Sequence, residues 1–220
     1  MNCSLHENPW LSIWVHPRKT IKGIVESNPN YCLWVLSAIF GFSSLIGIAQ
    51  TISLGNHLSL LAIVVLSAIL SPIWGFLIFS LSAWLLFQTG KWIGGSGDVP
   101  SIRTVVAWSH VPASLTVVVW TLLLFLFGQQ LLQNVSLPAD LTIGKTFLVF
   151  VGALIQMTAS VWGVVIFING LMVVQLFSIG KALLNVLLMV LLLGLILFVF
   201  LTAIQWSCSS FFDVPLITSQ

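Results

Sequence analysis

Charged residues are scarce in this chain. Asp, Glu, Lys and Arg together make up 5% of its 220 residues, whereas 59% of them are hydrophobic. A soluble domain usually carries about a quarter charged residues, so these few charges cannot cover a globular surface in water. The mean hydropathy of +1.13 agrees. Only helices and closed barrels can span a bilayer, and the long apolar runs lack the alternation of strands. We therefore expect an all-α integral membrane protein.

The apolar runs also lack the ionisable groups that membrane chemistry needs. The five acidic residues all fall in predicted loops or tails: Glu7, Glu26, Asp98, Asp140 and Asp213. The four histidines, His6, His16, His57 and His110, are scattered, and neither an HExxH nor a Gly-x-Ser-x-Gly motif is present. Catalysis depends on a positioned nucleophile, base or metal. We predict no catalytic residue, no cofactor and no metal site, and therefore no enzyme.

The same scarcity limits other functions. Ion-coupled carriers keep ionisable groups near the bilayer midplane, so coupled transport is disfavoured while a passive channel or a lipid-handling protein is not. A net charge of +2 gives no reason to expect nucleic acid as a partner. The three cysteines, Cys3, Cys32 and Cys208, are an odd number divided between the two predicted faces, which indicates free thiols. A disulfide between two copies through Cys208 stays open.

Five long apolar runs are separated by turn formers and charges. A spanning helix needs about 20 mostly apolar residues, and the runs cover residues 31–54, 58–88, 105–127, 146–174 and 183–206. They predict a five-helix transmembrane bundle. The second run is long for one span, but splitting it at Ser71-Pro72 leaves two pieces that are too short. One tilted helix with Pro72 inside is therefore expected, and six spans are the alternative.

The basic residues indicate an orientation. Cytoplasmic loops carry an excess of Lys and Arg. With the N-terminus in the cytoplasm, six of the seven basic residues lie on that side and only Lys145 lies opposite; the six are Arg18, Lys19, Lys22, Lys91, Arg103 and Lys181. We expect a cytoplasmic segment over residues 1–30, a membrane domain over residues 31–206 and an extracytoplasmic tail over residues 207–220.

The cytoplasmic segment has an amphipathic pattern of its own. Pro17 suits the first position of a helix, and Ile21, Ile24 and Val25 would then share one face. Trp10 and Trp14 precede this helix, and indole rings favour the headgroup region. The start of the chain lacks the pattern of a signal peptide, so we expect the N-terminus not to be cleaved off. The pattern predicts a short helix lying on the cytoplasmic leaflet. A solvated arm packed on the loops is the alternative.

Polar residues inside the spans are candidates for structural or partner contacts. A stripe of small residues with one amide follows the fourth span: Gly152, Gln156, Ala159, Gly163 and Gly170. Such stripes allow helix backbones to approach and amides to bond across the contact. Helix packing is the first interpretation, with a pore lining as the alternative. In the first span Ser37 and Gly41 have the same spacing.

Two further groups of polar residues stand out. Pro112 would free the carbonyl of Trp108, which a nearby ring N–H or hydroxyl could satisfy; His110 is then a structural histidine or a group that senses a ligand or a proton. Asn169, Gln175, Lys181 and Asn185 lie where the fourth span meets the fifth. A solvated, hydrogen-bonded turn explains them.

The loop between the second and third spans carries a family resemblance. Its residues 90–97, from Gly90 and Lys91 through Gly94 and Gly95, lead to Arg103 and to a helix with Pro112 about two turns in. This resembles the Yip1 domain family. Residues 8–29 and 162–183 agree with the family's N-terminal signature and with its fourth and fifth helices, so the resemblance covers residues 8–206. It implies five helices with a cytoplasmic N-terminus.

The resemblance also sets limits on function. Eukaryotic members of that family bind Rab GTPases, but this chain has only about 30 residues before the first span and lacks their Asp-Leu-Tyr-Gly-Pro motif. Rab-type binding is therefore not expected, and the short form resembles prokaryotic members. We expect a non-enzymatic scaffold or adaptor of a bacterial cytoplasmic membrane, with lipids, a second copy or another membrane protein as partners. A passive channel or lipid-handling protein that uses a cleft between kinked helices is the alternative.

Overall fold

The computed structural model describes residues 8–133 and 142–212, with side chains up to Gln205 in the last helix. Within these ranges the chain is helical and contains no strand. The elements are α1 (Pro9–Val15), α2 (Pro17–Ser27), α3 (Leu33–Thr51), η1 (Leu54–Asn56), α4 (Leu60–Trp92), α5 (Val99–Ser109), η2 (Pro112–Ser114), α6 (Leu115–Phe127), α7 (Gln130–Gln133), α8 (Ile143–Val174) and α9 (Ile179–Phe212). The all-α prediction is confirmed for the described residues.

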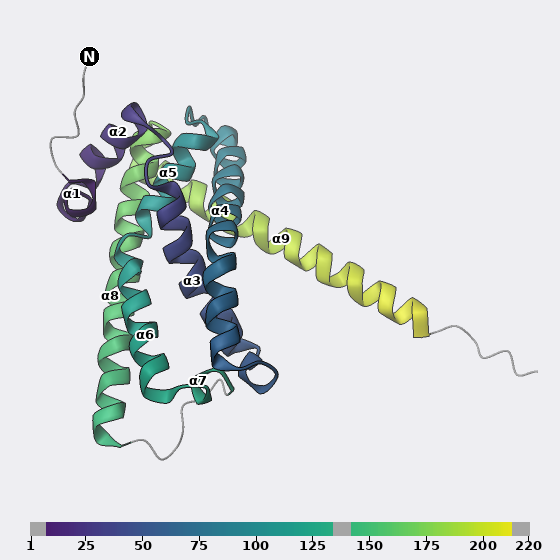
Figure 1. The fold of residues 1–220 in the computed structure, drawn as a ribbon. Coiled ribbons are helices and arrows are strands. Elements are labelled where there is room, and N and C mark those ends of the chain that lie inside the picture. The colour runs from purple at the N-terminus through teal and green to yellow at the C-terminus, as the bar shows by residue number, and fades with distance from the viewer. Residues whose placement is uncertain (1–7, 134–141, 213–220) are drawn as a thin grey trace, which may run out of the picture.

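Four helices are long and apolar enough to cross a membrane, namely α3, α4, α8 and the part of α9 up to Gln205. A fifth crossing results if α5 and the segment Pro112–Phe127 count as one span, although they are bent by 47° at the break between them. The protein is therefore a multi-pass membrane protein with four or five candidate spans. In Figure 1, α3, α4, α6 and α8 lie together as a bundle.

Pro72 lies inside α4, which is one continuous helix as expected. A proline has no N–H, so the carbonyl four residues earlier loses its helical partner. Here that carbonyl belongs to Ala68, and the hydroxyl of Ser71 donates to it at 2.9 Å. A neighbouring serine thus satisfies the backbone group that Pro72 frees, which is a common arrangement in membrane helices.

Helices α3 and α4 pack backbone to backbone through small residues. A Cβ atom added to Gly41 would lie 2.7 Å from the carbonyl carbon of Ser71, and one added to Gly75 would lie 2.7 Å from that of Ser37. Ser37 and Gly41 are four residues apart, as are Ser71 and Gly75, so each helix presents a Ser and a Gly to the other. The small-residue packing predicted for Ser37 and Gly41 is confirmed.

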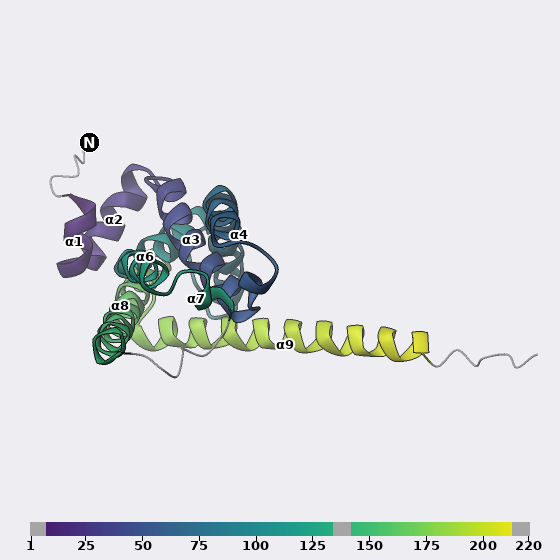
Figure 2. The same cartoon turned by 60° about the horizontal axis from the view of Figure 1, so that its bottom comes forward.

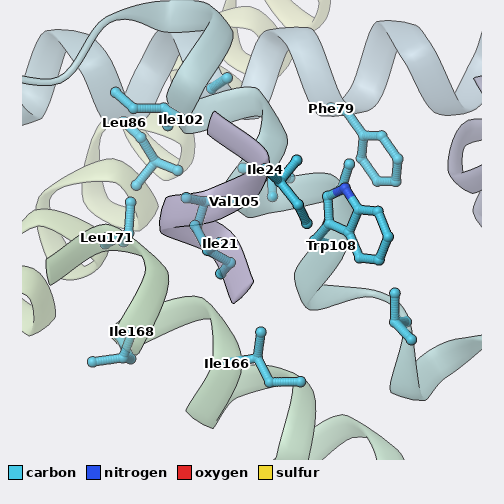
Figure 3. Packing of buried hydrophobic residues seen from close by; sticks show 14 of the residues in the cluster. Ile21, Ile24, Phe79, Leu86, Ile102, Val105, Trp108, Ile166, Ile168 and Leu171 are labelled. Atoms are coloured by element: carbon cyan, nitrogen blue, oxygen red, sulfur yellow. The ribbon is translucent and has the colours of Figure 1, made fainter. Parts of the chain in front are cut away.

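The two N-terminal helices cover one end of the bundle. Ile21 and Ile24 of α2 are fully buried in the main hydrophobic core, with the core residues Phe79, Leu86, Ile102, Val105, Trp108, Ile166, Ile168 and Leu171 (Figure 3). Trp10 of α1 contacts Trp108 with 5.3 Å between ring centroids. The helix predicted to start at Pro17 is present, and its apolar face contacts protein rather than lying free for a lipid leaflet.

Helix α9 leaves the bundle after its first turns (Figures 1 and 2). Only Ala182 and Asn185 of its described side chains are buried. From residue 194 to residue 205 every residue is exposed. This stretch of the apolar helix therefore presents an exposed surface outside the bundle.

Basic residues collect at one end of the molecule. Six of the seven lie on α2, at the end of α4, on α5 and at the start of α9, which meet at the same end of the bundle in Figure 1. Lys145 lies near the start of α8, at the opposite end. Among the predicted free thiols, Cys32 is free and partly exposed, while the other two cysteine side chains fall outside the described part.

Candidate functional site

The loop between α4 and α5 needs its glycines for two separate reasons. Gly94 has a φ of +83°, a backbone conformation that side chains other than that of glycine rarely adopt. Gly95 lies instead in close contact: a Cβ atom there would overlap Oε1 of Gln175 and lie 2.8 Å from Cζ of Phe177. The Gly95 N–H also donates to the carbonyl of Gly90 at 2.8 Å. The loop is therefore closely fitted to the turn between α8 and α9.

Gln175 is the centre of this contact. It is 2% exposed, and a Cβ added to Gly90 or Gly95 would collide with its side-chain amide. Its side-chain Nε2 donates to the carbonyl of Leu86 at 3.4 Å, and its backbone carbonyl accepts from the N–H of Ser96 at 3.4 Å. The expectation of a solvated turn is wrong for Gln175. Gly90 and Gly95 lie directly against the amide, where any side chain would overlap it.

A second buried polar pair joins α4 to α9. The hydroxyl of Thr89 and Oδ1 of Asn185 lie 2.6 Å apart, and both residues are fully buried. Asn185 is therefore also unlike the solvated residue that the sequence suggested. Its Nδ2 atom is buried without a hydrogen-bond partner in the described part of the chain.

The other predicted residues of this region lie outside the buried contact. Lys91 and Lys181 are exposed, and the Nζ atom of Lys91 lies 4.2 Å from the ring centroid of Phe87. Asn169 is partly exposed and accepts a hydrogen bond at 2.6 Å from Nε of Arg18, which links α2 to α8. Sequence reasoning thus grouped four polar residues that the structure divides into a buried pair and an outer pair.

The break between α5 and α6 is built around His110 and Pro112. Helix α5 ends at Ser109, and Pro112, which is buried, starts the short helix η2. Two side chains converge on the carbonyl of Val106: Nδ1 of His110 and Oγ of Ser109, each at 2.7 Å. A ring nitrogen of His110 therefore does bond a backbone carbonyl, as predicted, but the carbonyl is that of Val106 and not that of Trp108. The carbonyl of Trp108 instead accepts from the N–H of Val111 at 3.2 Å.

The imidazole ring of His110 is held between aromatic rings. Its centroid lies 4.7 Å from that of Phe40, in an edge-on arrangement, and 5.2 Å from that of Phe79. These contacts come from α3 and α4, so His110 lies where the broken third span meets the first two helices.

Two cavities meet at His110. The first, of about 360 Å³, lies among α4, α5, α8 and α9 and is lined by Ser82, Leu86, Val106, Ser109, His110, Ala113, Ala159, Ser160, Gly163, Val164, Phe167, Val186, Met189 and Val190. The second, of about 340 Å³, lies on the other side, among α3, η2 and α6, and shares His110 and Ala113 with the first. Cavities of this size hold small molecules in many proteins. Among the described residues, no Lys, Arg, Asp or Glu lines either of them.

The small-residue stripe of α8 packs inside the molecule. A Cβ added to Gly152 would lie 3.0 Å from Val119, one added to Gly163 would lie 2.9 Å from the carbonyl oxygen of Ser109, and one added to Gly170 would lie 2.6 Å from Val105. At Gly163 the close neighbour is the backbone of α5, and at Gly152 and Gly170 it is a valine side chain, so the stripe lets neighbouring helices approach closely. Gln156 is partly exposed, and its side chain makes no hydrogen bond to another helix in the part of the chain that the structure describes.

Sequence reasoning suggested a cleft between kinked helices but did not name its lining residues, and it missed the close fit of the glycine loop to the α8–α9 turn. The motif around Lys91, Gly94 and Gly95 marked the loop, but nothing in the sequence names Gln175 as the residue that it encloses. Among the described residues, no three of the His, Cys, Asp and Glu side chains are placed to hold a metal ion.

Comparison with known families agrees with the motifs. Residues 11–201 match the model of the Yip1 domain family. A search of curated proteins and a search of solved structures gave no match. The match covers most of the chain, which therefore belongs to the Yip1 domain family.

Proposed function

We propose that this Yip1-domain membrane protein acts without catalysis, as a scaffold or adaptor that works through helix packing and through contacts with lipids and other membrane proteins. Helix α9 is the observation that carries this proposal. A helix that is apolar on all sides is stable only when it is surrounded by lipid or by other helices. Between residues 194 and 205 α9 offers such a surface outside the bundle, where a second copy or another membrane protein has access to it.

The proposal includes an orientation and a location. The concentration of six basic residues at one end supports a cytoplasmic position for that end, because short cytoplasmic loops are rich in Lys and Arg. With α5 and α6 as one bent span, the chain then crosses the membrane five times, and the tail after α9 is extracytoplasmic. Residues 1–30 form a cytoplasmic segment on a membrane domain of residues 31–206. We place the protein in a bacterial cytoplasmic membrane because its motifs resemble those of prokaryotic members.

Site-specific cross-linking in native membranes tests the scaffold role. A photoreactive amino acid is placed at Leu197, which is 52% exposed on α9, and as a control at Ile166, which is fully buried. We expect protein adducts of defined mass from position 197 and none from position 166. Adducts with lipid alone at position 197 would contradict the proposal. An adduct of twice the chain mass identifies a second copy as the partner.

The cavities at His110 favour a second candidate function. A passive channel or a lipid-handling protein needs space between its helices, and the two cavities on either side of His110 supply it. Liposomes that contain the purified protein, with fluorescent lipid and small-ion reporters, test this alternative. Flux above that of protein-free liposomes supports it, and equal flux rules it out.

A further inference from the structure

The cavity among α4, α5, α8 and α9 has a few polar groups in an apolar wall. Its lining is mainly aliphatic and aromatic, and the polar groups are His110 and the hydroxyls of Ser82, Ser109 and Ser160. Sites for small molecules typically combine such an apolar wall with a few placed polar groups. What those groups can still donate or accept determines which ligand fits.

The hydrogen bonds within the protein leave mainly acceptors. A carbonyl oxygen only accepts, so Nδ1 of His110 must donate to Val106, and Nε2 of the neutral ring keeps its lone pair. The hydroxyl of Ser109 donates to the same carbonyl at 2.7 Å, and that of Ser160 donates to the carbonyl of Gln156 at 2.8 Å. Both serine oxygens therefore remain as acceptors, and the hydroxyl of Ser82, which has no hydrogen-bond partner in the described part of the chain, can accept or donate. A ligand that complements this lining brings a hydrogen-bond donor.

The uncharged lining of the cavity also limits which ligands can bind. No Lys or Arg lines the cavity, so a carboxylate or phosphate would enter an apolar space without a counterion, which is strongly unfavourable. A volume of about 360 Å³ is small for a ligand site and suits one apolar chain rather than two. The wall residues Val164 and Val190 are 58% and 56% exposed at the outer surface of α8 and α9, so the cavity is reached from the lipid side.

We propose that this cavity binds an uncharged single-chain lipid alcohol, such as a long-chain alcohol or a monoacylglycerol, whose hydroxyl group donates a hydrogen bond to Nε2 of His110. The chain of the ligand occupies the apolar part of the cavity between α8 and α9. This proposal does not depend on the scaffold role. For the lipid-handling alternative, it specifies which class of lipid would be bound. Binding without flux in liposomes would keep this proposal and remove that alternative.

Competition between matched ligands tests the proposal. The full-length protein in phosphatidylcholine nanodiscs is labelled with 1-hexadecanol that carries a diazirine in its chain, and the labelled peptides are mapped by mass spectrometry. Unlabelled 1-hexadecanol, hexadecyl methyl ether and hexadecanoate serve as competitors. The ether differs from the alcohol in lacking the donor, and one hydrogen bond of ordinary strength corresponds to about a three- to tenfold difference in affinity.

We expect label on the α8 and α9 residues of the cavity, and about a three- to tenfold lower half-effective concentration for the alcohol than for the ether. Hexadecanoate should compete more weakly than the alcohol. Equal competition by alcohol and ether, or label confined to the outer surface of the bundle, would overturn the proposal.

A variant pair assigns the effect to His110. His110→Phe keeps an aromatic ring against Phe40 and Phe79 and removes both ring nitrogens, so it should bind alcohol and ether equally. His57→Phe, in an exposed turn after η1, is the matched control and should keep the preference for the alcohol. A preference unchanged in His110→Phe would refute the assigned contact. Should that variant fail to fold, the comparison of alcohol with ether on the unchanged protein still decides.

Discussion

Replacing Gly95 by valine tests the fit between the glycine loop and the α8–α9 turn. The new side chain would collide with the amide of Gln175 and lie 2.8 Å from Phe177 and 3.0 Å from the carbonyl of Gly90. The side chains of Gln175 and Phe177 are both buried, at 2% and 6% exposed, so they are packed on all sides and cannot simply turn away. The loop or the turn must therefore move.

Two costs add in this variant. Forcing extra methyl groups into a packed region costs about 1–3 kcal/mol. If Gln175 is displaced, its buried amide loses the bond to Leu86, and leaving such a group unsatisfied costs about 1–3 kcal/mol more. We expect a loss of about 2–6 kcal/mol in the free energy of unfolding. Taking the value for soluble domains of similar size, a melting temperature falls by about 2–4 °C per kcal/mol, so a drop of at least about 4 °C should be measurable in detergent.

Two controls separate this fit from general effects. Ser96→Ala removes only the hydroxyl that lies 3.4 Å from the carbonyl of Gln175, and it should cost no more than about 1 kcal/mol. Gly180→Val makes the same chemical change as Gly95→Val at a glycine with nothing within 4 Å of its added Cβ. If Gly95→Val melts within 1 °C of both controls, the close fit has no energetic role and the reasoning fails.

Three further predictions concern the bundle. Gly163→Leu, at a site 2.9 Å from a backbone oxygen of α5, should lower the melting temperature while native mass spectrometry shows an unchanged oligomer; Gly144→Leu, which has open space, should change neither. Ile21→Ala removes a fully buried side chain and should cost about 2–5 kcal/mol in thermal unfolding, and no loss would mean that α2 does not pack on the bundle. In cysteine-free protein, single cysteines at Ser96 and Ser219 should be labelled from opposite sides of the membrane, whereas labelling from one side would favour six spans.

The long helices could be predicted because the bilayer dictates their length and composition. Each predicted apolar run coincides with a helix or, in the third run, with a broken pair of helices. The packing of Ser37 and Gly41 was also predictable, since small residues four apart mark a close helix contact regardless of partner. The partner residues Ser71 and Gly75 on α4 have the same spacing, but neither pair by itself indicates that the two pairs meet.

Burial of polar groups could not be predicted from sequence. A polar residue needs either water or a hydrogen-bond partner, and the sequence does not say which one it has. The partners of Gln175 and Asn185 are Leu86 and Thr89, about 90 residues earlier in the chain. The 47° bend near His110 could not be predicted for a related reason. Pro112 indicates a weak point in a helix, but the size of the bend depends on the residues that pack around it.

The contact between α3 and α4 has a consequence for how the protein is made. All four of its small residues lie before residue 76, and the two helices are joined by only a short connection around η1. Both sides of this contact are therefore present in the chain as soon as α4 has been synthesised. Helix α9 follows all of these elements in the chain, and of its described side chains only Ala182 and Asn185 are buried against them.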